Sequence, residues 1–143
     1  MSHLHLAPSI SIPGFKGDLV TSSNPDYPQA ISRWAANAQR PALVVAYPTS
    51  AEDTALAIKY ARERKLDLAI RGGGHSASGA SSSDGGLVVD LSRYLNGAEV
   101  DLGGEEKVVR VGGGAIWETV DRKAIECGFA TVGGTVNHTG VGG

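Results

Sequence analysis

The most informative stretch of this chain is residues 66–79, Leu66-Asp67-Leu68-Ala69-Ile70-Arg71-Gly72-Gly73-Gly74-His75-Ser76-Ala77-Ser78-Gly79. The first five residues are an apolar run typical of a strand, and the rest form a glycine-rich loop. Because glycine lacks a Cβ, such a backbone can adopt positive φ and turn its N–H groups toward a phosphate, and an adjacent arginine adds charge-assisted hydrogen bonds. A histidine directly after the three glycines adds a nucleophilic ring, which points to a covalently attached cofactor.

Two common phosphate-binding motifs are excluded in this loop. A Walker A loop requires a lysine after its second glycine, and Ala80 occupies that position. The dinucleotide fingerprint Gly-x-Gly-x-x-Gly lacks its third glycine. A plain surface turn remains the alternative, because clusters of glycine and serine are common in loops.

The elements around the loop predict a parallel α/β arrangement. Residues 43–47 are a compact apolar run between two prolines, as in a buried strand. Ser50 and Asp53 resemble a capping box, so we expect a helix from there to about Lys65. Residues 87–91 predict a third strand. Because ligands of open α/β sheets bind at the carboxyl ends of strands, the glycine loop lies where a ligand is expected.

The second half of the chain has a different pattern. Residues 98–102 and 107–111 flank a pair of glycines and predict a hairpin. Residues 115–127 predict a helix that Gly128 ends. A second glycine-rich loop occupies residues 131–143, and the sequence stops inside it. We therefore expect the front part of a larger unit, or a shortened product.

An arm and a short helix are expected before these elements. Residues 1–27 are rich in Ser, Pro, Gly and Asn and show no sustained period, whereas residues 28–39 carry apolar side chains at helical spacing. Trp34 and Trp117 lie at helical positions, which favours the core over a cofactor platform. Cys127 is predicted to be a small buried residue.

The composition excludes several classes of protein. The chain has 143 residues, 41% hydrophobic and 20% charged, which suits one soluble globular domain. A net charge of −2 gives no surface for nucleic acid or an anionic membrane, and one cysteine excludes a disulfide framework. His3 and His5 are too few for a metal site. The start lacks the features of a signal peptide, so we expect a cytoplasmic protein.

Five motifs occur in a specific order. They are Tyr47-Pro48-Thr49-Ser50-Ala51-Glu52-Asp53, Arg71-Gly72-Gly73-Gly74-His75-Ser76, Gly85-Gly86-Leu87-Val88-Val89-Asp90-Leu91-Ser92, Val111-Gly112-Gly113-Gly114 and Gly133-Gly134-Thr135-Val136-Asn137-His138-Thr139-Gly140. The series resembles the FAD-linked oxidases of the berberine-bridge-enzyme-like group, within the vanillyl-alcohol-oxidase superfamily. The resemblance implies an α+β fold: a FAD-binding PCMH-type domain with a small parallel α/β lobe followed by a mixed, mainly antiparallel lobe, truncated at its C-terminal end. Residues 1–39 would be an N-terminal arm and first helix, and residues 40–143 the incomplete domain.

The resemblance also implies a FAD site. His75 matches the histidine that bonds the 8α-methyl of the flavin, and the second glycine loop has no cysteine for the further link of some members, so attachment would be through His75 only. The predicted cofactor-binding residues are Arg71, Gly72, Gly73, Gly74, His75, Ser76, Gly133, Gly134, Thr135, His138, Thr139 and Gly140. For His138, a polar turn residue remains the alternative.

The activity implied is that of a covalent flavoprotein oxidase. Flavin N5 would take hydride from an alcohol or sugar-type substrate, and O2 would reoxidise the flavin to give H2O2. The catalytic residues and substrate are not assigned, because in such enzymes they come largely from later segments. The alternatives are a stand-alone FAD-binding module or non-catalytic remnant, and an interaction module that has lost the ligand. Exposed edges of an incomplete domain would favour a homo-oligomer.

Overall fold

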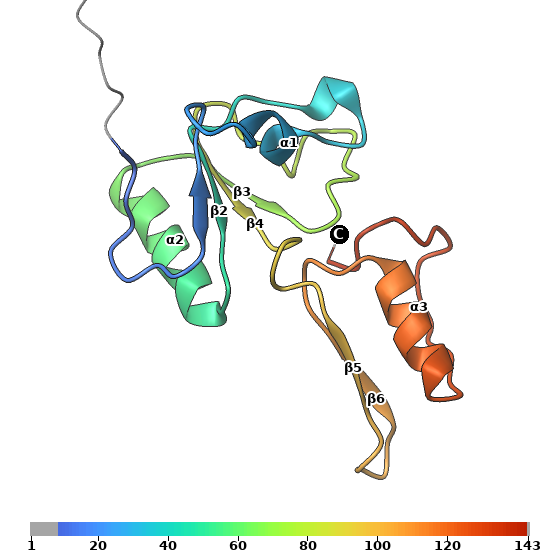
Figure 1. The fold of residues 1–143 in the computed structure, drawn as a ribbon. Helices are drawn as coiled ribbons and strands as arrows, with labels where there is room; N and C mark the ends of the chain where they lie inside the picture. The colour runs from blue at the N-terminus through green and yellow to red at the C-terminus, as the bar shows by residue number, and fades with distance from the viewer. Residues whose placement is uncertain (1–8, 143) are drawn as a thin grey trace, which may run out of the picture.

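The first lobe of the molecule is built on a four-stranded sheet. The computed structural model describes residues 9–142. The sheet has the strand order β1-β2-β4-β3, in which β2, β4 and β3 are parallel and β1 is antiparallel to β2 (Figure 1). The strands are β1 (Asp18–Val20), β2 (Val44–Tyr47), β3 (Leu68–Arg71) and β4 (Leu87–Asp90). The predicted parallel lobe is therefore confirmed, with one antiparallel strand added at its edge.

Both faces of the central strands are buried. Every residue of β2 and β4 is buried, as the apolar runs 44–47 and 87–89 predict, and the buried run of β4 ends in the charged Asp90. On one face, Val44 and Leu87 pack against α2 (Ala51–Glu63). On the other face, Val45 and Val88 pack with residues of α1 (Tyr27–Ile31). The sheet is thus held between two helices, and its strand ends are fixed in position.

The start of α2 is fixed by side-chain capping. The Ser50 hydroxyl accepts a hydrogen bond from the Asp53 amide at 3.1 Å, which confirms the predicted N-cap. The Asp53 carboxylate is itself buried and accepts from the amides of Lys16 and Thr49 and from the Thr49 hydroxyl. This carboxylate therefore joins the N-terminal segment to the first turn of the helix.

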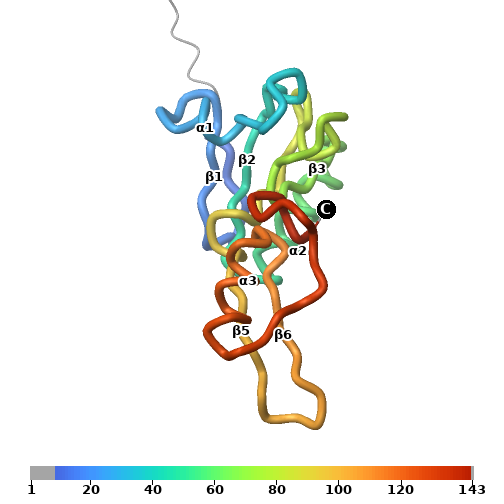
Figure 2. Tube along the Cα trace, turned by 90° about the vertical axis from the view of Figure 1, so that its right-hand side faces the viewer, coloured from blue at the N-terminus to red at the C-terminus, as the bar shows by residue number. Residues whose placement is uncertain are grey.

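The second lobe is a hairpin with one helix beside it. Strands β5 (Ala98–Asp101) and β6 (Val108–Val111) pair antiparallel, and α3 (Trp117–Glu126) lies next to them. The helix is followed by Gly128 at φ +78°, the left-handed residue that the sequence predicts. Figure 2 shows the hairpin projecting away from the first lobe. The expected hairpin and helix are both confirmed.

The predicted helix over residues 28–39 is wrong. The chain forms α1, then becomes extended at Ser32 (φ −61°, ψ 144°), and makes a short 3-10 helix, η1 (Ala36–Ala38). The break coincides with a buried guanidinium: Arg33 donates to the carbonyl oxygens of Ala30, Ser32 and Ser81. This tertiary contact outweighs the local apolar spacing.

Three further expectations about burial and order need correction. The arm of residues 1–27 contains β1, which is too short to give a period. Trp34 is 65% exposed and not part of the core. Cys127 is exposed at the C-cap of α3 and not buried as predicted. Between residues 9 and 142, no helix is long and apolar enough to cross a membrane.

Candidate functional site

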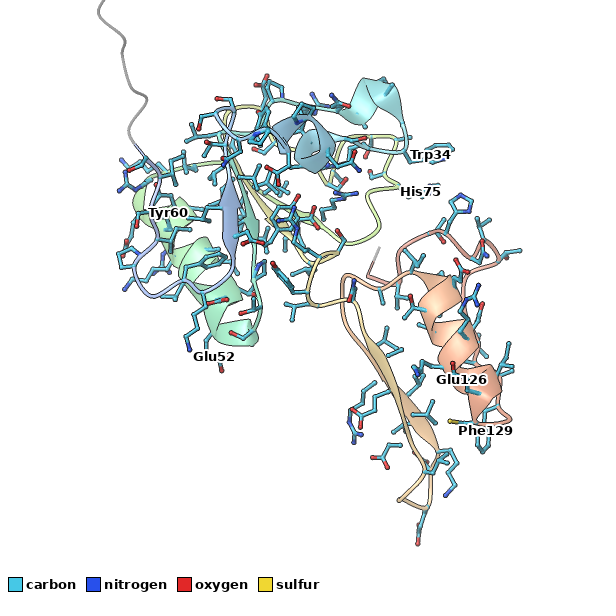
Figure 3. All side chains as sticks on the ribbon, in the orientation of Figure 1. Trp34, Glu52, Tyr60, His75, Glu126 and Phe129 are labelled. Carbon is cyan, nitrogen blue, oxygen red and sulfur yellow. The ribbon has the colours of Figure 1, made fainter. Side chains whose placement is uncertain are left out.

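The first glycine loop begins at the carboxyl end of β3 and faces the second lobe. Figure 3 shows the labelled side chains of Trp34 and His75 together on this side of the first lobe. Of the three consecutive glycines, only Gly74 has a positive φ, at +71°. The positive φ that the glycine run allows is therefore used at Gly74, and Gly72 and Gly73 meet a different requirement.

The two glycine loops approach each other backbone to backbone. A Cβ on Gly73 would lie 2.5 Å from the amide nitrogen of Gly140, and one on Gly72 would lie 2.8 Å from the carbonyl oxygen of Gly113. Side chains at these positions would push the lobes apart. Gly72 and Gly73 are thus required for close approach, which is a packing requirement that a sequence cannot reveal.

The second glycine loop is fastened to the start of α3. The Trp117 amide donates to the Thr139 carbonyl at 3.0 Å, and the Glu118 amide donates to the Asn137 carbonyl at 2.8 Å. Gly140 also forms an isolated bridge with Ile116. The first amides of α3 are therefore used to hold the loop in place.

A pocket of about 590 Å³ lies where the two loops meet. It has the size and concave form of a ligand site. Its lining residues are Ile70, Gly72, Gly73, Gly74, His75, Ser76, Ala80, Ser81, Trp117, Gly134, Thr139, Gly140 and Gly142. Eight of the twelve predicted cofactor-binding residues are among them, and Arg71, Gly133, Thr135 and His138 are not.

Those four residues have other surroundings. The Arg71 guanidinium donates through Nη1 to the fully buried carboxylate of Asp90 at 2.8 Å, while its buried Nε has no partner within residues 9–142. Gly133 lies under the indole of Trp117, and Thr135 is exposed. The ring of His138 lies 4.9 Å from the ring of His75, measured between centroids. His138 is therefore near the site, although it does not line the pocket.

His75 lies at the wall of the pocket between two aromatic rings. Its imidazole stacks on Trp34 with a centroid distance of 4.6 Å and an interplanar angle of 20°. Its Nε2 atom is buried and has no hydrogen-bond partner within residues 9–142. A buried nitrogen without a partner is uncommon in proteins and is typical of a site that a ligand completes.

Other polar groups around the pocket also lack partners in the described part of the chain. They include the Arg71 Nε and Ser81 Oγ atoms, both buried. The hydrogen bonds found between residues 9 and 142 include none in which an amide N–H of residues 72–76 is the donor. These donors fit a ligand with several acceptor oxygens, such as a dinucleotide pyrophosphate. The residues present therefore fit the cofactor that the sequence implies.

Sequence reasoning missed part of the lining. Ala80 and Ser81 come directly after the first loop, so their place in the chain could have indicated them. Trp117 is half-buried and lines the pocket from α3, contrary to the expectation of a core residue. Gly142 could have been found only from the meeting of the lobes. His3 and His5 lie outside the described residues, and within the described range no group of three His, Cys, Asp or Glu side chains could hold a metal ion.

The comparison with protein families gives a match over most of the chain. Residues 41–143 match the family described as FAD binding domain. The (R)-6-hydroxynicotine oxidase of Paenarthrobacter nicotinovorans is 38% identical over 96 residues, which cover 67% of this chain and 20% of that protein. The chain therefore represents a small part of the length of this relative.

Solved structures resemble the chain over nearly its full length. The 6-hydroxy-D-nicotine oxidase of Arthrobacter nicotinovorans superposes with a TM-score of 0.85 and 28% identity, over 93% of this chain and 29% of that one. The glucooligosaccharide oxidase of Acremonium strictum, which carries a 6-S-cysteinyl, 8α-N1-histidyl FAD, has a TM-score of 0.78 at 24% identity, over 89% of this chain and 26% of that one. The similarity to glucooligosaccharide oxidase shows that the chain has the α+β fold of a PCMH-type FAD-binding domain. The family match over residues 41–143 establishes that the chain belongs to the FAD binding domain family, and its relatives include FAD-linked oxidoreductases.

Proposed function

We propose that the pocket between the two lobes binds FAD and that His75 forms the covalent bond to it. The observation that carries this proposal is the position of His75, at the pocket wall and within the run of residues 72–76, whose amides donate no hydrogen bond in the described chain. The buried Nε2 without a partner supports it. The histidyl FAD of glucooligosaccharide oxidase supports the same type of linkage.

The two loops have separate tasks in this proposal. The amides of residues 72–76 bind the pyrophosphate oxygens, and the Arg71–Asp90 ion pair holds the end of β3 that carries them. Gly134, Thr139 and Gly140 line the opposite side of the pocket. Because the Trp117 indole packs against Gly134, the second loop presents its backbone to the cofactor at a fixed position.

With FAD bound, His75 would lose its ring N–H proton and form a C–N bond to the 8α carbon, which would lose one hydrogen. The two electrons and two protons released would be taken up by O2 as H2O2. His75 alone makes the link, because the second loop has no cysteine.

The complete protein would use this site to oxidise a small molecule. We propose an alcohol or sugar-type donor, whose hydride FAD would accept at N5 and whose electrons O2 would finally receive. The lining residues of this chain bind and orient the cofactor. Within the described range the lining includes no carboxylate, lysine or tyrosine, so the substrate's proton is removed by a group from another part of the protein.

That lining also favours a second candidate, a module that binds FAD without catalysis. A chain of this kind would bind FAD and show no reduction of the flavin by alcohols, sugars or hydroxynicotine. Anaerobic absorbance at 450 nm separates the two candidates, since bleaching by any of these donors contradicts the non-catalytic module.

The covalent site is tested by intact mass. The chain is purified from a flavin-replete host, denatured and weighed, and we expect a mass gain of one FAD on the peptide that contains His75. His75→Ala should abolish the gain. His138→Ala is the matched control, and it should retain a histidine-dependent gain. An FAD found on another peptide, or retained in His75→Ala, would contradict His75 as the attachment site.

A further inference from the structure

The structure assigns to Trp34 the task of holding the His75 imidazole in one orientation at the pocket wall. This inference rests on the proposed function of His75. Trp34 lies in the irregular segment between α1 and η1, far from His75 in the sequence. The family motifs begin after it, so the role of Trp34 is visible only in three dimensions.

Trp34 contacts the glycine loop at two points. Its amide N–H donates to the carbonyl oxygen of Gly74 at 3.2 Å, and its indole stacks on the next residue, His75, at 4.6 Å. A side chain that is 65% exposed would ordinarily move between rotamers. Here the stack gives the indole a defined partner, and the backbone bond fixes the distance between the two residues.

The segment that carries Trp34 is itself anchored. The buried Arg33 guanidinium donates through Nη2 to the Ser81 carbonyl oxygen at 2.7 Å, and Ser81 lines the same pocket. Trp34 thus bonds to Gly74, directly before His75, and Arg33 bonds to Ser81, a few residues after it. This arrangement explains why a solvent-exposed indole occupies a defined position.

The stack restricts His75 without blocking its chemistry. The lone pair of an imidazole nitrogen lies in the plane of the ring, so an indole stacked over the ring face does not occupy the direction in which that nitrogen forms a bond. With one face covered by Trp34 and His138 at 4.9 Å on another side, the imidazole has few alternative orientations. Trp34 is a positioning residue, because it acts on the bond through His75.

The first test needs no flavin. The histidine ring protons of the 143-residue chain are recorded by NMR at a fixed pH, and the His75 signal is identified by its loss in His75→Gln. We expect an upfield ring-current shift that Trp34→Ala abolishes and Trp34→Phe partly retains. Phe129→Ala removes another exposed aromatic ring, at the far end of α3 (Figure 3), and should leave the signal unchanged. A His75 signal identical in the parent chain and Trp34→Ala would overturn the inference.

The second test measures bond formation. FAD is added to the flavin-free chain, and intact mass gives the rate of attachment while fluorescence titration gives the affinity. Trp34→Ala should slow attachment by about two- to tenfold, which corresponds to the interaction energy of one aromatic stack. The affinity for FAD and the melting temperature should not change. Trp34→Phe should restore the rate. A loss of affinity or melting temperature in parallel with the rate would indicate a structural role and contradict positioning. If the parent chain gains no FAD, the covalent proposal fails, and the His75 signal still decides the role of Trp34.

Discussion

The two lobes differ in how completely they bury their own strands. In the first lobe, β2 and β4 are buried along their whole length between α1 and α2. In the second lobe, no residue of β5 or β6 is fully buried, and α3 buries only Val120 and Ala124. The first lobe therefore has a core of its own, whereas the second depends on its contact with the first through the glycine loops.

The largest expected effect is a core deletion in the first lobe. Leu87 is fully buried, so Leu87→Ala should lower the free energy of unfolding by about 2–5 kcal/mol. Leu102, next to β5, is 46% exposed, and Leu102→Ala should change the free energy of unfolding by less than about 0.5 kcal/mol. Urea denaturation followed by circular dichroism gives both values. Equal losses would mean that the two lobes are not packed differently.

The next effect is at the junction of the lobes. Gly73→Ala places a methyl group 2.5 Å from the Gly140 amide, and we expect a cost of about 1–3 kcal/mol from the forced displacement. The second glycine loop should then be cleaved faster in limited proteolysis, while the first lobe remains resistant. Gly97→Ala is the control, because an added Cβ meets no atom within 4 Å there. Uniform cleavage of both lobes in Gly73→Ala would contradict a local junction.

The first lobe could be predicted well because its signals are local. The continuous apolar runs at residues 44–47 and 87–89 indicate buried strands, and Ser50 marks the start of α2 through its own hydroxyl. The failures have non-local causes. The helix over residues 28–39 is interrupted where Arg33 reaches the Ser81 carbonyl, and nothing in the local spacing predicts that contact.

The candidate site was predictable in composition and less so in geometry. The order of the glycine motifs pointed to the family, which the match over residues 41–143 confirms, and the cofactor roles of both loops and of His75 stay predictions. Gly72 and Gly73 allow the two loops to approach closely, whereas Gly74 adopts a positive φ, and this difference is visible only once the loops are in contact. The same contact places Trp117 in the pocket lining. Trp34 was missed because helical spacing favoured the core, whereas the chain turns it outward onto His75.

The smallest expected effect compares one carboxylate from each lobe. Burial alone would raise the pKa of Asp53, but hydrogen bonds from Thr49 and from the Lys16 amide outweigh it and lower the pKa. In the second lobe, the Gly103 amide and then Arg110 lower the pKa of Asp101, whose side chain remains 36% exposed. Both groups bind protons less readily in the folded chain, yet only Asp53 is shielded from water.

A lowered folded pKa stabilises the protein above the unfolded value, about 3.9 for aspartate, and this contribution is lost as the pH falls through the folded value. Asp53→Asn should therefore lower the free energy of unfolding by about 1 kcal/mol at neutral pH, because one amide oxygen cannot accept all three hydrogen bonds. It should also flatten the decline of the melting temperature below pH 4, because the asparagine does not titrate. Asp101→Asn should leave the profile between pH 6 and pH 3 unchanged, since water and salt screen a partly exposed pair. Thermal unfolding by circular dichroism measures both. A profile that responds to Asp101 and not to Asp53 would place the acid-sensitive contact in the second lobe and reverse the comparison of the two lobes.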